Sequence, residues 1–443
     1  MKRSLYYSTL AWCLLLFAFT LPLSKSAGNI LLFLIYPLVA AGAFFAKDIR
    51  EAVMPNVKQP LTLAFTLIFA VSFVGVFFSG KYADGMQTAN KFLELLAIYL
   101  MVSVLIPILQ DKTNQYRSAE SLLTAFLIGL MALNVIGVMT YLGIVGDKKY
   151  VLPLSPLHVH HIWFSNVNAL GLYAAAAFLL YSRRDLSRGV NAFLYSSLTL
   201  AVLCILLSTS RTAWFGILLT SMVMAFLVSR SRKVFFLIAG VSAVICVVAY
   251  LFVPFIHERI HMIGSDISNY SEGETVTSLG GRFLMWKAAL RMFWSNPLIG
   301  VGSGDYVPTM AAYVNSGQFP KFLLDFNQPH NMYLFALATN GLPGLIVLLY
   351  VFYRILKFTL PIMQTGERDL GREKERLFAF LATATAVHFM IAGLTDSFFS
   401  IQILRYTFAF IIGVCVRESV TSAQVSEQRD QSLPSTNSRD LSL

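Results

Sequence analysis

One long polar stretch, residues 254–331, decides how this chain is organised: PFIHERIHMIGSDISNYSEGETVTSLGGRFLMWKAALRMFWSNPLIGVGSGDYVPTMAAYVNSGQFPKFLLDFNQPHN. It begins after the apolar run 234–253 and ends where the chain becomes apolar again. Its ionisable residues are denser than in any other segment between two apolar runs: Glu258, Arg259, Asp266, Arg282, Lys287, Arg291, Asp305, Lys321 and Asp325. We interpret this stretch as a folded platform that carries half of an active site, the other half coming from basic residues at the ends of earlier apolar runs.

The composition on either side of this stretch is that of a membrane protein. Of the 443 residues, 56% are hydrophobic and only 13% are charged, whereas soluble globular chains carry about 25% charged residues. The net charge of +11 is therefore read first as a signal for the orientation of membrane spans and for contact with membrane lipids, rather than for nucleic acid. The four cysteines lie inside apolar runs, so neither a disulfide framework nor a zinc site is predicted.

The hydropathy pattern predicts an all-α polytopic membrane protein. A membrane span needs about 20 apolar residues, and by that measure the chain contains about twelve spans. We place them at 5–23, 29–46, 60–78, 92–109, 121–142, 163–181, 192–208, 212–228, 234–253, 342–358, 377–393 and 406–416. The first is read as an uncleaved span, because Leu21-Pro22-Leu23-Ser24-Lys25 offers no cleavage site for a signal peptidase.

The distribution of lysine and arginine predicts the orientation. With the N-terminus inside the cell, most of the 34 basic residues fall in cytoplasmic loops, as the positive-inside rule requires. The chain then divides into spans one to nine (1–253), one large outer loop (254–330), spans ten to twelve (331–416) and a disordered cytoplasmic tail (417–443), which is rich in Ser, Gln and Asp.

The large loop is predicted to contain short helices. Residues 281–294 have helical spacing, with Arg282 and Trp286 on one face and Lys287 and Arg291 on another, which is typical of a helix lying at the membrane surface. At the end of the loop, Asn331 is the expected N-cap of a helix over 332–339, which the sequence Gly-Leu-Pro-Gly at 341–344 then interrupts.

Three basic residues are candidates for binding phosphate. Arg211 lies in the tight outer hairpin between two spans, beside Ser208, Thr209 and Ser210, and an arginine binds phosphate in a bidentate geometry that lysine lacks. Arg282 follows two glycines at the start of the predicted surface helix, and Lys25 lies in the first outer loop. Each of the three could instead be a solvated side chain that contacts lipid headgroups.

His330 is the leading candidate for a general base. It lies between Pro329 and a capped helix at the water-facing entry of a span, and imidazole titrates near neutral pH. The rival cluster His158, His160 and His161 has a spacing that could suit a metal, but no carboxylate lies nearby in the sequence. No closely spaced Asp pair for Mg²⁺ or Mn²⁺ occurs in the first outer loop or the large loop, so we predict a reaction that needs no metal and no cofactor.

At Arg211, Arg282 and Pro329-His330-Asn331-Met332-Tyr333-Leu334 the sequence resembles the O-antigen ligase and polymerase superfamily of bacterial inner membranes. The likeness extends over about 195–400 and is carried by the order of these motifs. It implies a GT-C-like membrane glycosyltransferase fold with its active site at the periplasmic face. It also implies a donor glycan on undecaprenyl pyrophosphate, lipid A-core as acceptor, and inversion at the transferred sugar without a metal.

The resemblance also implies roles for individual residues. His330 would deprotonate the acceptor hydroxyl, and Arg211 and Arg282, with Lys25, would hold the pyrophosphate. The expected supporting polar groups are Asn331, Asn166, Asn168 and His161. The alternatives are an O-antigen polymerase, whose Arg-x10-Gly pattern fits Arg291 to Gly302, a protein O-oligosaccharyltransferase, or a lipid-linked glycan transporter, which should place polar groups midway along its spans.

Overall fold

A computed structural model describes residues 3–113, 118–145, 160–183, 186–208, 210–229, 231–252, 254–271, 277–364 and 372–416. Within these residues the chain is built from helices and contains no strand, which confirms the predicted all-α polytopic class. The predicted tail 417–443, His158 and most of the outer loop 143–162 lie outside the described residues.

The predicted spans all fall on helices. The helices that correspond to them are α1 (Arg3–Thr20), α2 (Lys25–Phe45), α4 (Pro60–Val76), α5 (Tyr82–Lys112), α6 (Ser118–Tyr141), α7 (His161–Tyr181), α8 (Arg188–Leu207), α9 (Arg211–Val228), α10 (Arg232–Phe252), α14 (Met332–Gln364), α15 (Glu373–Ala392) and a final helix Gln402–Val416. By length and composition, eight of the described helices can cross a membrane, or nine if α3 (Lys47–Val57) and α4, bent by 74° at their junction, form one span. The number twelve and the GT-C likeness therefore stay predictions.

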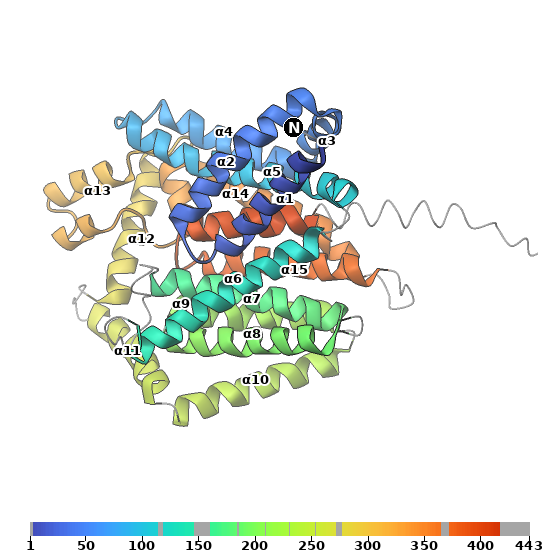
Figure 1. Ribbon diagram of the computed structural model, residues 1–443. Coiled ribbons are helices and arrows are strands. Elements are labelled where there is room, and N and C mark those ends of the chain that lie inside the picture. Colours follow the sequence, from blue (N-terminus) through green and yellow to red (C-terminus); the bar gives the residue numbers. More distant parts are fainter. Residues whose placement is uncertain are drawn as a thin grey trace, which may run out of the picture.

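The large loop folds into helices that lie across one end of the bundle (Figure 1). They are α11 (Pro254–Ser271), α12 (Ser278–Ser295), α13 (Tyr306–Asn315) and the short 3-10 helix η1 (Lys321–Asp325). The α12 helix contains the predicted surface helix, capped by the Thr277 hydroxyl, which accepts from Gly280 N at 3.0 Å. Its buried face, with Met285 and Met292, forms a small core of its own with α13 and the beginning of α14.

Two glycines allow this loop to pack closely against the bundle. Gly341 has φ 61° and ψ −159° and breaks α14 as the sequence predicted, and a Cβ there would lie 2.6 Å from Pro297 O. Gly302, with φ 99°, approaches the end of α4, where a Cβ would lie 2.7 Å from the Ser79 hydroxyl. A side chain at either position would meet neighbouring residues, so the loop is held against α4 and α14 by backbone contact.

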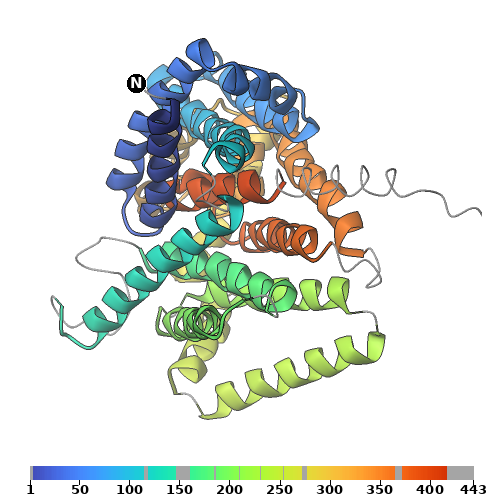
Figure 2. The ribbon, with the colours of Figure 1, turned by 45° about the vertical axis from the view of Figure 1, so that its right-hand side comes forward.

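Contacts also join the segments that were predicted to share one side of the membrane. Asp305 of the large loop accepts hydrogen bonds from Gly80 N and Lys81 N, at 2.6 and 3.0 Å. At the other end of the bundle, Lys374 pairs with Glu120 at 3.0 Å. The helix α10 stands apart from its neighbours at the edge of the bundle (Figure 2). Loops assigned to the same side thus lie at the same end, while the assignment of that side to the periplasm stays a prediction.

Candidate active site

The candidate site is built around the point where the large loop enters α14. Asn331 caps this helix as predicted, because its side-chain oxygen accepts from Tyr333 N and Leu334 N, both at 3.0 Å. Its amide nitrogen donates to Leu394 O at 3.0 Å, which ties the start of α14 to the segment that follows α15. Asn331 thus acts on the site by holding two backbone segments together.

His330, immediately before this cap, is held in an unusual conformation. Its φ of 48° is left-handed, a region that residues other than glycine adopt rarely. Trp286 Nε1 of α12 donates to Pro329 O at 3.0 Å, and the Phe326 ring packs edge-on against the imidazole with the ring centroids 5.7 Å apart. Contacts from two sides therefore fix the backbone of this residue and the direction of its side chain.

The imidazole is paired with a carboxylate that the sequence analysis did not select, Asp396. His330 Nδ1 lies 3.1 Å from Asp396 Oδ1, and the two side chains are 23% and 2% exposed. A carboxylate at Nδ1 favours the tautomer that carries its proton on this nitrogen, which leaves Nε2 free to accept a proton. Asp396 is the single acidic residue between the last two predicted spans, 377–393 and 406–416. This isolated position is the feature of the sequence by which it could have been selected as a candidate.

The carboxylate is itself held in place. Asp396 Oδ1 also accepts from Ser397 N at 2.8 Å and from Gln328 Nε2 at 3.2 Å. Because a nearly inaccessible charge is costly without partners, these donors and the imidazole together compensate for its burial. The result is a histidine and aspartate pair whose geometry is set by α14, α15 and the end of the large loop.

The charges of Asp396 and Arg211 both act on the guanidinium of Arg282. Burial lowers the pKa of Arg282 from its ordinary value; the charge of Asp396 opposes this shift and the charge of Arg211 adds to it. Arg211, at the first residue of α9, is 26% exposed and lies 3.8 Å from Asp266 of α11. The structure thus gathers the two predicted arginines and the buried aspartate that holds His330, from α9, α12 and the loop after α15.

Two histidines at the start of α7, His160 and His161, adjoin this group. Burial lowers the pKa of His160; Asp396 opposes the shift and His330 adds to it. The His160 and His161 rings are in contact at a tilt of 35°, with their centroids 4.2 Å apart, so His161 is linked to the site through its neighbour. Within the described ranges, no group of three His, Cys, Asp or Glu residues has a geometry that could hold a metal ion.

Lys25, Asn166 and Asn168 have other partners. Lys25 Nζ lies 4.1 Å from the centre of the Trp163 ring, which places it beside α7 rather than beside the two arginines. Asn166 Oδ1 lies 2.9 Å from His388 Nε2, and Asn168 Oδ1 accepts from Asn134 Nδ2 at 2.7 Å. Both asparagines are fully buried and link α7 to α15 and α6, so any support that they give to the site acts through the helix packing.

The segment that carries most of these residues matches a known protein family. Residues 196–349 match the O-antigen ligase family. The resemblance predicted from the motif order is therefore confirmed over this segment, which contains Arg211, Arg282 and His330 and ends before Asp396. A protein of Haemophilus influenzae described as uncharacterized is 32% identical over 167 residues, which are 36% of this chain and 41% of that protein. The chain thus matches less than half the length of this relative.

Proposed function

We propose that this protein is a membrane glycosyltransferase that moves O-antigen polysaccharide from undecaprenyl pyrophosphate to lipid A-core at the periplasmic face of the inner membrane. The observation that carries the proposal is the pair His330–Asp396 in the same electrostatic environment as Arg282 and Arg211. A base and two fixed cations are what a sugar transfer from a pyrophosphate requires, and no step needs a metal.

In this reaction the acceptor hydroxyl attacks the anomeric carbon of the donor sugar from the face opposite the pyrophosphate. The new carbon–oxygen bond forms as the bond from that carbon to the pyrophosphate oxygen breaks, and the stereochemistry inverts. The hydroxyl proton passes to His330 Nε2, and the leaving undecaprenyl pyrophosphate takes the electron pair. A positioned base of this kind contributes about 10²- to 10⁴-fold to a rate.

Each charged neighbour has a defined part in this step. Asp396, on the other ring nitrogen, holds the imidazole in the accepting tautomer and stabilises the imidazolium as it forms. Arg282 and Arg211 oppose the negative charge that develops on the leaving pyrophosphate. Because Arg282 is partly buried, its interaction with that charge is stronger than the same contact at a fully solvated surface.

The depth of the polar residues favours an enzyme over a transporter. His388 and Asn166 are buried in the helix bundle, but α15 ends at Ala392 and α7 begins at His161. At a rise of about 1.5 Å per residue, both side chains come from within roughly two helical turns of those helix ends. A transporter is expected to place such groups near the bilayer centre, whereas here they lie just beneath the candidate site.

The polymerase alternative receives less support. The arginine of the Arg-x10-Gly pattern, Arg291, is exposed on α12 and stacks on the Tyr313 ring at 5.1 Å. It therefore faces α13 on the surface of the large loop. A catalytic arginine would be expected within reach of the charge of Asp396, as Arg282 is.

The lipopolysaccharide of a deletion strain tests the proposal. Loss of all long chains, with polymer accumulating on the lipid carrier, is the expected result, and the wild-type gene should restore the long chains. His330→Asn should not restore them at an equal protein level in the membrane. Core that carries a single repeat unit would identify a polymerase instead, and full-length lipopolysaccharide in the deletion strain would exclude both activities.

A further inference from the structure

A large polar cavity adjoins the candidate site, and the reaction described above does not use it. Its volume is about 490 Å³, within the range of about 300–1,000 Å³ that is typical of small-molecule sites. Six segments surround it: the start of α2, the first turns of α5, the start of α7, the large loop, the first turn of α14 and the chain that enters the last helix. Its lining includes Lys25, Gln87, Lys91, Trp163, Asn327 and Gln402.

The chemistry of the lining is that of a carbohydrate site. Amide side chains such as Gln87, Asn327 and Gln402 can both donate to and accept from sugar hydroxyls. Trp163 offers an aromatic surface for the apolar face of a sugar ring. Lys25 and Lys91 add two positive charges against the one negative charge of Asp84, and this net positive lining suits an anionic substituent on the saccharide.

Two buried polar atoms of the cavity wall lack a partner. Tyr306 lines the cavity and is 3% exposed, and its hydroxyl has no hydrogen-bond partner among the described residues. The side-chain oxygen of Gln328, also in the lining, is buried without a partner in the same part of the chain. Buried polar groups are almost always hydrogen-bonded, so these two atoms point to a bound molecule that supplies hydroxyl groups.

The cavity lies next to the His330–Asp396 pair, although neither of these two residues lines it. Gln328 Nε2 donates to Asp396 Oδ1 at 3.2 Å, and Trp163 packs against His160 with the ring centroids 5.6 Å apart. Neither Arg211 nor Arg282 lines the cavity. A molecule in it is therefore separated from Asp396 by the side chain of Gln328, and it does not contact the two arginines.

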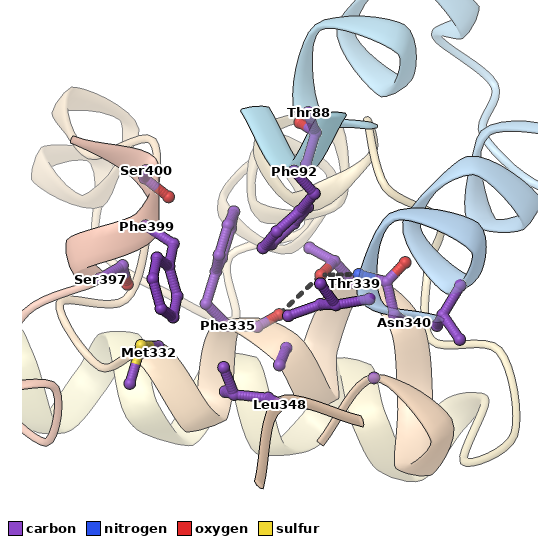
Figure 3. Close-up of a pocket in the computed structure, with 14 residues that line it drawn as sticks. Thr88, Phe92, Met332, Phe335, Thr339, Asn340, Leu348, Ser397, Phe399 and Ser400 are labelled. Atoms are coloured by element: carbon purple, nitrogen blue, oxygen red, sulfur yellow. Dashed lines mark hydrogen bonds between the residues drawn. The ribbon is translucent and has the colours of Figure 1, made fainter. Parts of the chain in front are cut away.

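An adjoining apolar cavity defines which part of a ligand fits here. It lies between α5 and α14, where Phe92 and Phe335 face one another (Figure 3), and it shares Thr88, Phe335 and Ser400 with the polar cavity. Its volume is only about 30 Å³, comparable to one water molecule in the liquid. A hydrocarbon chain does not fit in this space, so the apolar cavity does not extend the polar cavity for a lipid tail.

We propose that this cavity binds the saccharide end of the acceptor glycolipid, with an anionic substituent near Lys25 and Lys91. The proposal rests on the glycosyltransferase function above and assigns its second substrate site. It also reassigns Lys25 from the pyrophosphate of the donor to the acceptor.

Transfer kinetics on the purified protein in lipid nanodiscs test this assignment, with undecaprenyl-pyrophosphate glycan as donor and a lipid A-core glycolipid as acceptor. Tyr306→Phe and Asn327→Ala should each raise KM for the acceptor about threefold to tenfold, the effect of one lost hydrogen bond, and leave KM for the donor within about twofold. Asn90→Ala, an exposed residue of α5 that does not line the cavity, is the matched control and should change neither constant.

Binding without turnover separates this proposal from the proposed function. The acceptor glycolipid should bind His330→Asn about as tightly as wild type and bind His330→Asn with Asn327→Ala several-fold more weakly. Unchanged acceptor binding in the double variant, or a rise in KM for the donor in the single variants, overturns the cavity assignment alone. Absence of transfer by the wild-type protein overturns the proposed function, whatever the binding results show.

Discussion

The start of α14 and the C-terminal part of α15 each hold a histidine, and their surroundings differ. His330 is 23% exposed and faces a buried carboxylate. His388 is fully buried, with Nε2 at 2.9 Å from Asn166 Oδ1 and Nδ1 at 3.2 Å from the Tyr173 hydroxyl. The partners of His388 are neutral, so nothing there stabilises an imidazolium, whereas His330 has both an open side and a negative partner.

The two histidines also differ in backbone conformation. His330 has a left-handed φ of 48° and lies between a loop and a cap, while His388 sits inside a regular helix. Gly216 of α9 leaves room for the His388 ring, since a Cβ there would lie 3.0 Å from its Cε1. One histidine is held in a strained backbone at an accessible surface, and the other fills space between helices. We therefore expect activity to depend on the first and stability on the second.

The largest effect is expected at His330. His330→Asn should reduce the transfer rate about 10³-fold, within the range for loss of a general base. Asparagine tolerates a left-handed φ better than most residues, so the thermal midpoint in detergent should change by no more than about 2 °C. A rate within tenfold of wild type, measured on purified protein with saturating substrates, would show that another group accepts the proton.

The second largest effect is expected for Asp396→Asn, which should reduce the transfer rate about 10²-fold. The amide keeps the shape of the side chain and can still accept from Ser397 N, which donates at 2.8 Å. It removes the negative charge that stabilises the imidazolium, and an NH₂ group turned towards the ring would donate to Nδ1 and leave the proton on Nε2. The loss should appear in kcat, with KM for both substrates nearly unchanged. A loss confined to KM would mean that Asp396 serves binding rather than proton transfer.

The separation of two partners along the chain decides whether their contact could be predicted from the sequence. The helix and loop pattern follows from hydropathy. Within it, three residues could be selected from their local sequence: Arg211 in a hairpin between two spans, Arg282 after two glycines, and His330 at the end of the large loop. Asp396 lies 66 residues after His330, and its pairing depends on how α14 packs against α15. No local pattern specifies that packing.

The polar cavity was beyond prediction for the same reason. Lys25, Lys91, Trp163 and Gln402 reach it from segments far apart in the sequence, and each residue alone is an ordinary polar group at a helix end. The sequence analysis selected Lys25 for its charge and assigned it to the pyrophosphate. Only the contact with Trp163 separates it from the arginines.

His388 is expected to affect stability more than catalysis. His388→Leu would leave Asn166 Oδ1 and the Tyr173 hydroxyl without their partner in a buried setting, at a cost of about 1–3 kcal/mol. The thermal midpoint should fall by several degrees, while the rate per folded molecule should stay within about threefold of wild type. A loss of rate as large as that of His330→Asn, in protein that remains folded, would remove the distinction between the two histidines.

The arginine at the start of α9 is expected to affect the rate less than His330 or Asp396. Arg211→Lys keeps the charge and loses the bidentate geometry, so the rate should fall about tenfold and KM for the donor should rise. The matched control is Asp266→Asn, because Asp266 lies 3.8 Å from Arg211. A partly exposed ion pair of this length contributes little, so that variant should change the rate less than about threefold. If Asp266→Asn reduced the rate as much as Arg211→Lys, the arginine would matter for anchoring α11 rather than for holding the pyrophosphate, and the leaving group would depend on Arg282 alone.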